Sequence, residues 1–139
     1  MARILIVDDS PSQLMGIRRI VEKLGHQALT AEDGAAGVEA AKREVPDLIL
    51  MDVVMPNLNG FQATRSITRE PTTKHIPVIL VTTKDQDTDR VWGMRQGAKA
   101  YLTKPFSEEE LAETITRYLG GGDGSKDGDS GGDPGPSAA

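Results

Sequence analysis

The stretch that decides the fold is "ILIVDDSPSQ", residues 4–13. Four apolar residues, 4–7, run directly into two adjacent carboxylates, Asp8 and Asp9. An uninterrupted apolar run of this length is typical of a strand that is buried on both faces, as in a parallel sheet. Two neighbouring aspartates repel each other, so we expect a group that offsets their charge at the end of this strand.

Four further short apolar runs follow along the chain, and segments with helical periodicity lie between them. Strands are expected at 4–7, 27–31, 48–51, 78–81 and 100–103, and helices at about 12–24, 34–44, 60–69, 87–96 and 107–119. Gly25 and Gly97 end two of these helices, and Ser107 with Glu110 forms a capping box at the start of the last one. Five strands that are each followed by a helix predict an α/β fold with a doubly wound, five-stranded parallel sheet.

The composition is that of a single globular domain. The chain has 139 residues, of which 37% are hydrophobic and 27% charged, and its net charge is −5. An acidic balance without a basic run argues against nucleic acid as a partner and against insertion into a membrane. The absence of cysteine excludes disulfides, thiol catalysis and cysteine-bound metals. With no signal peptide and no apolar run long enough to span a bilayer, a cytoplasmic location is expected.

The last twenty residues differ sharply from the rest. The segment 120–139, "GGGDGSKDGDSGGDPGPSAA", contains eight glycines and four aspartates and no large apolar side chain. Such a segment cannot bury enough apolar surface to offset the entropy lost on ordering, so we expect it to be disordered. The folded domain is therefore expected over 1–119, with a passive solubilising tail after it.

The residues that follow the expected strands form a candidate site. In doubly wound folds, ligands bind outside the carboxyl ends of the strands, at the switch in strand order. These positions hold Asp8 and Asp9, Asp52, Thr82 with Thr83, and Lys104 followed by Pro105. Each of them alone has an ordinary explanation as a helix cap, a turn residue or a solvated side chain. Their joint arrival at one edge of the sheet predicts a functional site.

Three converging carboxylates favour a hard divalent cation. Mg²⁺ fits, because it prefers oxygen ligands and is usually bound by one or two carboxylates together with waters. Zinc is disfavoured, since cysteine is absent and His26 and His75 lie far from the carboxylates in sequence. A carboxylate beside Mg²⁺, a lysine and a threonine suggests phosphoryl transfer. In such a reaction a protein mainly positions the reacting groups and neutralises the charge on the transferred oxygens. Asp52, at the end of the central strand, is best placed to become an aspartyl phosphate.

These residues resemble the receiver domain of bacterial two-component response regulators, of the single-domain CheY-like type. The resemblance covers 1–119 and rests on "VDDS" at 7–10, "LILMDVVMPNLNGFQ" at 48–62, "PVILVTT" at 77–83 and "GAKAYLTKPF" at 97–106. It implies a (βα)5, flavodoxin-like receiver fold. It also implies a signalling protein rather than an enzyme, one that catalyses only its own phosphorylation and dephosphorylation.

The resemblance implies a role for each residue at the phosphorylation site. Asp52 would be the phosphoacceptor. Asp9 would bind Mg²⁺ directly and Asp8 mainly through water, with Asp52 and the backbone carbonyl of Val54 as further ligands. Lys104 would pair with the phosphoryl group, and its bond to Pro105 would be cis.

Two further residues would carry the signal away from the site. Thr82 would be the switch hydroxyl that moves towards the phosphate, and Tyr101 the coupled aromatic that changes rotamer. From the residues alone, the favoured explanation of Tyr101 is a half-buried aromatic of an edge strand. Similarly, Trp92 is either ordinary packing of the helix at 87–96 or part of a signalling surface.

A closer resemblance, carried by "NGFQATR" at 59–65 and "VTTKDQDTDRVWGMRQGAKAYLTKP" at 81–105, is to PilH-type regulators of type IV pili and twitching motility. It implies a monomer that receives a phosphoryl group from a CheA-like histidine kinase. The target protein would bind the surface formed by 87–96, 100–103 and 107–119.

Other functions stay open at this point. The same residues would serve a phosphate sink for a shared kinase or a CheY-type regulator of the flagellar motor. A haloacid-dehalogenase-like phosphatase needs a second acid two residues after the nucleophile, and Asp52-Val53-Val54 lacks it. A nucleotide-binding module is disfavoured, because no glycine-rich phosphate loop follows the first strand.

Overall fold

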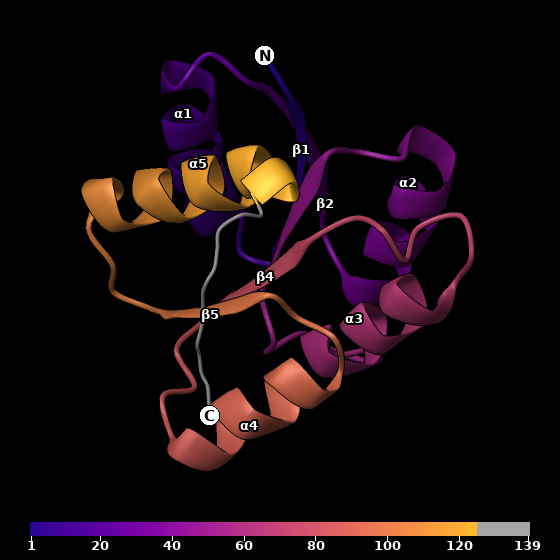
Figure 1. Ribbon diagram of the computed structural model, residues 1–139. Coiled ribbons are helices and arrows are strands. Elements are labelled where there is room, and N and C mark those ends of the chain that lie inside the picture. The colour runs from indigo at the N-terminus through magenta and orange to yellow at the C-terminus, as the bar shows by residue number, and fades with distance from the viewer. Residues whose placement is uncertain (125–139) are drawn as a thin grey trace.

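The computed structural model describes residues 1–124, in which five β-strands alternate with five α-helices (Figure 1). The elements are β1 (Arg3–Val7), α1 (Pro11–Lys23), β2 (Gln27–Ala31), α2 (Gly34–Glu44), β3 (Leu48–Met51), α3 (Gly60–Arg69), β4 (Val78–Thr82), α4 (Asp87–Arg95), β5 (Ala100–Thr103) and α5 (Glu108–Gly124). The predicted elements agree with these bounds to within one residue, except that α5 continues five residues past Leu119. The expected disorder of the tail lies, from residue 125 on, outside the described residues.

All strand pairs are parallel, and the order across the sheet is β2-β1-β3-β4-β5. The chain moves outward from β1 to β2, returns past β1 to β3, and then continues outward in the other direction. The order therefore switches between β1 and β3, which confirms the predicted doubly wound sheet. The ends of these two strands are where a ligand site is expected.

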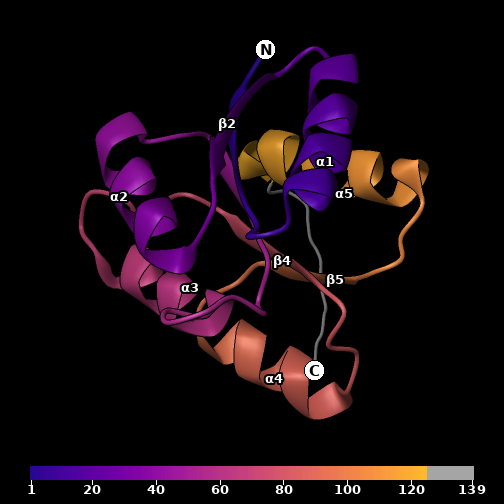
Figure 2. The ribbon, with the colours of Figure 1, turned by 180° about the vertical axis from the view of Figure 1, so that it is seen from behind.

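Helices cover both faces of the sheet, with α1 and α5 on one side and α2, α3 and α4 on the other (Figures 1 and 2). Side chains alternate between the two faces along each strand, so every central strand contributes to both cores. One core holds Leu5, Val7, Ile49, Met51 and Leu80, together with residues of α2 and α3. The other holds Ile4, Ile6, Leu48, Leu50 and Ile79, together with residues of α1 and α5. This explains why the central strands are apolar throughout, except at Arg3 where β1 begins and at Thr82 where β4 ends.

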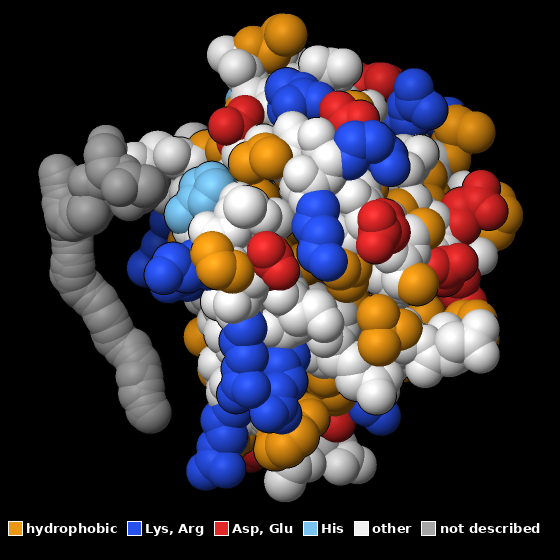
Figure 3. Space-filling view, turned by 90° about the vertical axis from the view of Figure 1, so that its right-hand side faces the viewer, with side chains coloured by type: hydrophobic (Ala, Val, Ile, Leu, Met, Phe, Trp, Pro, Cys, Tyr) orange, Lys and Arg blue, Asp and Glu red, His pale blue; other side chains and the backbone are white. Residues whose placement is uncertain are grey.

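Charge is unevenly distributed over the surface. Lys and Arg side chains gather in the lower part of the face shown in Figure 3, on the side of the molecule where α3 and α4 end. Helix carboxyl ends carry a partial negative charge, so cations there stabilise the helices. Among the described residues, no helix is both long and apolar enough to cross a membrane.

Candidate functional site

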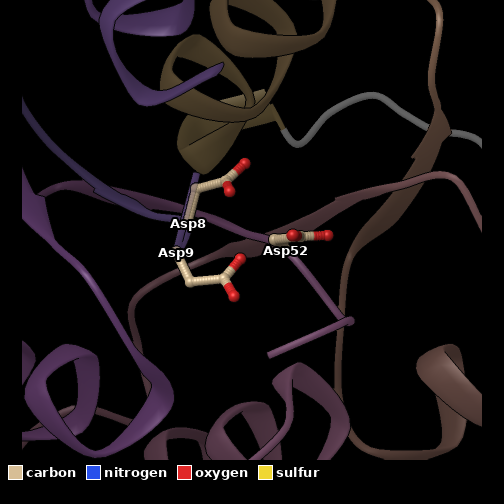
Figure 4. A group of neighbouring side chains, drawn as sticks. All are labelled: Asp8, Asp9 and Asp52. Atoms are coloured by element: carbon tan, nitrogen blue, oxygen red, sulfur yellow. The ribbon is translucent and has the colours of Figure 1, made fainter. Parts of the chain in front are cut away.

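Three carboxylates meet at the switch in strand order. Asp8 and Asp9 follow β1 and Asp52 follows β3, and one oxygen of each carboxylate lies within 4.8 Å of the others. All three side chains project to the same side of the strand ends (Figure 4). Asp8 and Asp52 are buried, with 2% and 8% of their surface exposed, whereas Asp9 is exposed. The structure thus brings together the three acids that the sequence places after different strands.

Backbone hydrogen bonds orient the two buried carboxylates. The amide of Ser10 donates to Oδ1 of Asp8 at 2.9 Å, and the amide of Val53 donates to Oδ1 of Asp52 at 2.8 Å. The start of α3 packs directly behind the second acid, because a Cβ atom on Gly60 would overlap the backbone oxygen of Asp52. Glycine is therefore required at this position to bring α3 so close to the site.

Lys104 reaches into the site from the loop after β5. Its Nζ lies 2.9 Å from Oδ2 of Asp8 and 3.9 Å from Oδ2 of Asp52, and it also contacts Oε1 of Gln13. The bond from Lys104 to Pro105 is cis. Gln13 is a site residue that the sequence pattern alone did not indicate. What could have indicated Gln13 in the sequence is its position in the first turn of α1, because this helix begins two residues after Asp9.

The surroundings of Asp52 disfavour its charged form. Burial raises the pKa of the Asp52 carboxyl above its usual value of 3.8, and the nearby charge of Asp8 raises it further. The ammonium of Lys104 and backbone donors act in the opposite direction, but burial dominates. A cation bound by these carboxylates would favour the ionised form. The donor set consists of oxygens alone and lacks nitrogen and sulfur, which fits Mg²⁺.

The residues expected to carry the signal lie beside this cluster. Thr82 ends β4 and is fully buried, and its Oγ1 accepts a hydrogen bond from the amide of Lys84 at 3.3 Å. The hydroxyl of Tyr101 donates to the carbonyl of Lys84 at 2.7 Å. Burial and the nearby Asp89 raise the pKa of Tyr101 to about 12, so this hydroxyl keeps its proton at neutral pH. Both side chains are therefore hydrogen-bonded to the same backbone residue.

Two further features border the site. Val54 lies two residues after Asp52, in the loop before α3, and 55% of its surface is exposed. A cavity of about 390 Å³ opens between α1 and the loop after β5, and it is lined by Gln13, Gly16, Ile17, Ile20, Thr83, Lys104, Pro105 and Phe106. Most of this lining is apolar, so Lys104 stands between a charged cluster and an apolar hollow.

Comparisons with known proteins agree with this geometry. The family profile of the response regulator receiver domain matches residues 4–116. Protein PilH of Pseudomonas aeruginosa is 60% identical over 121 residues, which make up 87% of this chain and all of that protein.

Solved structures show the same fold. The receiver domain of the sensor histidine kinase PA1611 from Pseudomonas aeruginosa, solved with a magnesium ion in its active-site cleft, is 34% identical, with a TM-score of 0.80. The match covers 86% of this chain and 98% of that one. The chemotaxis protein CheY4 of Vibrio cholerae is 31% identical with a TM-score of 0.80, over 85% of this chain and 98% of that one. The chain therefore belongs to the response regulator receiver domain family.

Proposed function

We propose that this chain is a stand-alone response regulator that accepts a phosphoryl group on Asp52 from the phosphohistidine of a CheA-like kinase. The observation that carries the proposal is the meeting of a buried, strand-ending carboxylate with two further acids and an ammonium group. A carboxylate with its charge disfavoured by burial becomes a usable nucleophile when cations surround it. Family membership supports the same chemistry.

The transfer would proceed by attack of a carboxylate oxygen of Asp52 on phosphorus. The bond between phosphorus and the histidine nitrogen breaks, and its electron pair leaves on the imidazole. Lys104, 3.9 Å from Asp52, neutralises charge on the transferred group. The amide of Val53 holds the attacking carboxylate in place.

The acid cluster would hold Mg²⁺ through Asp8, Asp9, Asp52 and the backbone carbonyl of Val54. When bound, the ion supplies positive charge that offsets the carboxylates and the phosphoryl oxygens. The magnesium-containing receiver structure of PA1611 supports this assignment. The all-oxygen donor set of the three aspartates supports it independently.

The response would pass through Thr82 and Tyr101 to the surface of α4, β5 and α5, where a target protein binds. The hydrogen bonds of both side chains to Lys84 support this route. We propose control of type IV pili and twitching motility as the process, on the strength of the 60% identity to PilH. The regulator acts as a cytoplasmic monomer and does not bind nucleic acid.

The test is phosphoryl uptake from phosphoramidate or acetyl phosphate, with Mg²⁺ or with a chelator. Wild-type protein is expected to take up an acid-stable, base-labile phosphoryl group only with Mg²⁺, and Asp52→Asn is expected to take up none. Glu39→Gln, an exposed acid of α2, is the matched control and should behave as wild type. Equal uptake by Asp52→Asn would refute the proposal, and the half-life of the product would separate a signalling switch from a phosphate sink.

A further inference from the structure

The ring of Tyr101 occupies a slot that α4 leaves open for it. A Cβ atom on Gly93 would lie 3.1 Å from Cδ2 and 3.2 Å from Cε2 of this ring, and 2.6 Å from Cδ1 of Leu80. Any side chain at position 93 would therefore compete with the ring for space. The missing side chain of Gly93 lets α4 lie flat against β4 and β5 with the ring between them.

Arg90, one turn earlier on the same helix, lies over the ring. Its guanidinium carbon is 5.2 Å from the ring centroid of Tyr101, within the range of a cation–π contact. Its Nη1 also donates to the backbone carbonyl of Tyr101 at 3.4 Å. Arg90 takes part in no ion pair among the described residues, so these contacts with Tyr101 account for its placement.

The far end of the ring is anchored to the loop that follows β4. The Tyr101 hydroxyl donates to the carbonyl of Lys84 at 2.7 Å, and the amide of Lys84 donates to Oγ1 of Thr82. Movement of the Thr82 hydroxyl would free the amide of Lys84, which lies in the peptide unit directly before the carbonyl that holds the ring. The position of the ring is therefore tied to the edge of the sheet that carries Asp52.

We propose that Arg90 is a positioning residue that holds the ring of Tyr101 in the Gly93 slot and so sets how readily α4 responds to phosphorylation. Arg90 touches neither the carboxylates nor the phosphoryl group, and it acts through its contacts with the ring and the backbone carbonyl of Tyr101. The holding of the ring follows from the contacts of Arg90 and Gly93. Its effect on the response rests on the proposed function.

The first measurement follows the ring itself, without any phosphodonor. The chain has two tyrosines, Tyr101 and Tyr118, so 3-fluorotyrosine labelling gives two fluorine resonances. In Arg90→Ala the Tyr101 resonance is expected to move towards that of free fluorotyrosine and to broaden, while Tyr118 stays unchanged. Arg90→Lys keeps the charge but cannot stack a planar group on the ring. Its Tyr101 resonance should therefore lie between those of wild type and Arg90→Ala. Arg95→Ala, an exposed arginine of the same helix, is the matched control.

The second measurement follows the response. Trp92 is the only tryptophan, lies on α4 and is 48% exposed, so its emission reports on this helix. With Mg²⁺ present, Arg90→Ala is expected to lower the phosphoramidate concentration that gives half of the emission change by about threefold, the factor of one partly exposed cation–π contact. Arg95→Ala should leave this concentration unchanged.

The outcomes separate the two proposals. An unchanged Tyr101 resonance in Arg90→Ala, or an equal change in Arg95→Ala, would overturn the role of Arg90. An unchanged or raised half-effect concentration in Arg90→Ala would also overturn it. Failure of the proposed function would appear instead as phosphoryl uptake that does not require Asp52, and the fluorine spectra would still report on Arg90.

Discussion

Asp52 lies in surroundings that penalise its charge when no cation is bound. It is 8% exposed, burial raises its pKa, and the carboxylate of Asp8 lies close by. An uncharged side chain of the same shape escapes this penalty. The same residue that makes the site reactive is therefore expected to weaken the metal-free fold.

Asp52→Asn is expected to stabilise the protein in the presence of a chelator, by about 1 kcal/mol in the free energy of unfolding, a common size for a single substitution. Urea denaturation at neutral pH measures this directly. The exposed Asp9→Asn is the control and should change stability less. Addition of Mg²⁺ should stabilise wild type more than Asp52→Asn. A less stable Asp52→Asn protein in chelator would contradict this account.

The stability difference between wild type and Asp52→Asn should depend on pH in a direction that the pKa of Asp52 fixes. Because the pKa of Asp52 is higher in the folded chain than in the unfolded one, the folded state binds this proton more tightly. The penalty from its charge is therefore present at neutral pH and disappears as the pH falls through the raised pKa towards 3.8. In chelator, the stability difference between wild type and Asp52→Asn should shrink on acidification. A difference that grows would show that burial of the charge is not its cause.

Single residues differ in how far the sequence reveals them. Asp8, Asp9 and Asp52 were predictable because each follows an apolar strand, and parallel strands end at one edge. Gln13 and Arg90 were not, because their contacts are made by long side chains that reach across from helices. Periodicity indicates which face of a helix is buried, but it does not indicate where a flexible polar side chain ends.

At the scale of elements, α1 and α4 each contain a glycine with a different structural reason. Nothing lies within 4 Å of a Cβ atom placed on Gly16, whereas such an atom on Gly93 would lie 2.6 Å from Leu80. Alanine favours an α-helix over glycine by about 1 kcal/mol when space is available. At position 93 the overlap with Leu80 and Tyr101 works against this gain.

Gly16→Ala is therefore expected to stabilise the protein by about 1 kcal/mol, and Gly93→Ala to destabilise it by about 1–2 kcal/mol through overpacking. Thermal unfolding of the two variants under the same conditions tests both signs, and each variant serves as the control for the other. Stabilisation by Gly93→Ala would show that α4 lies less tightly on the sheet than its contacts indicate.

The bounds of most elements were predictable because their periodicity is strong and is interrupted by glycine or proline. The end of α5 was not, since the glycines at 120–122 favour a stop after Leu119, yet the helix continues to Gly124. The conformation of Val45 was also not predictable. It ends α2 with φ at +43°, a left-handed conformation that usually favours glycine.

At the scale of the whole molecule, the sheet divides the protein into two cores that share their strands. The doubly wound class was predictable from five apolar strands with a helix after each one. The strand order β2-β1-β3-β4-β5 was not predictable, because the residue pattern within a strand does not indicate which strands lie beside it. The two edge strands differ from the central ones. Every residue of β3 and β4 is buried, whereas every residue of β5 is only partly buried.

Amide hydrogen exchange is expected to follow this division. Amides of β1, β3 and β4 should exchange only on global unfolding, because both neighbouring strands and both helical layers must separate first. Amides of β5 should exchange roughly tenfold faster or more, since edge elements open by local fluctuations of lower free energy. Mass spectrometry of peptides that cover each strand measures the contrast, and equal protection of β5 and β3 would contradict it.

The partly buried β5 also bears on how the protein avoids aggregation. An edge strand offers unpaired backbone groups on its outer side, on which a strand from another molecule can build. Here that strand has only four residues, and the exposed Lys99 directly precedes it. A short strand offers few backbone groups for pairing, and each added copy would bring another lysine charge beside Lys99. The short length of β5 and the charge of Lys99 are therefore expected to protect the open side of the sheet against fibril growth.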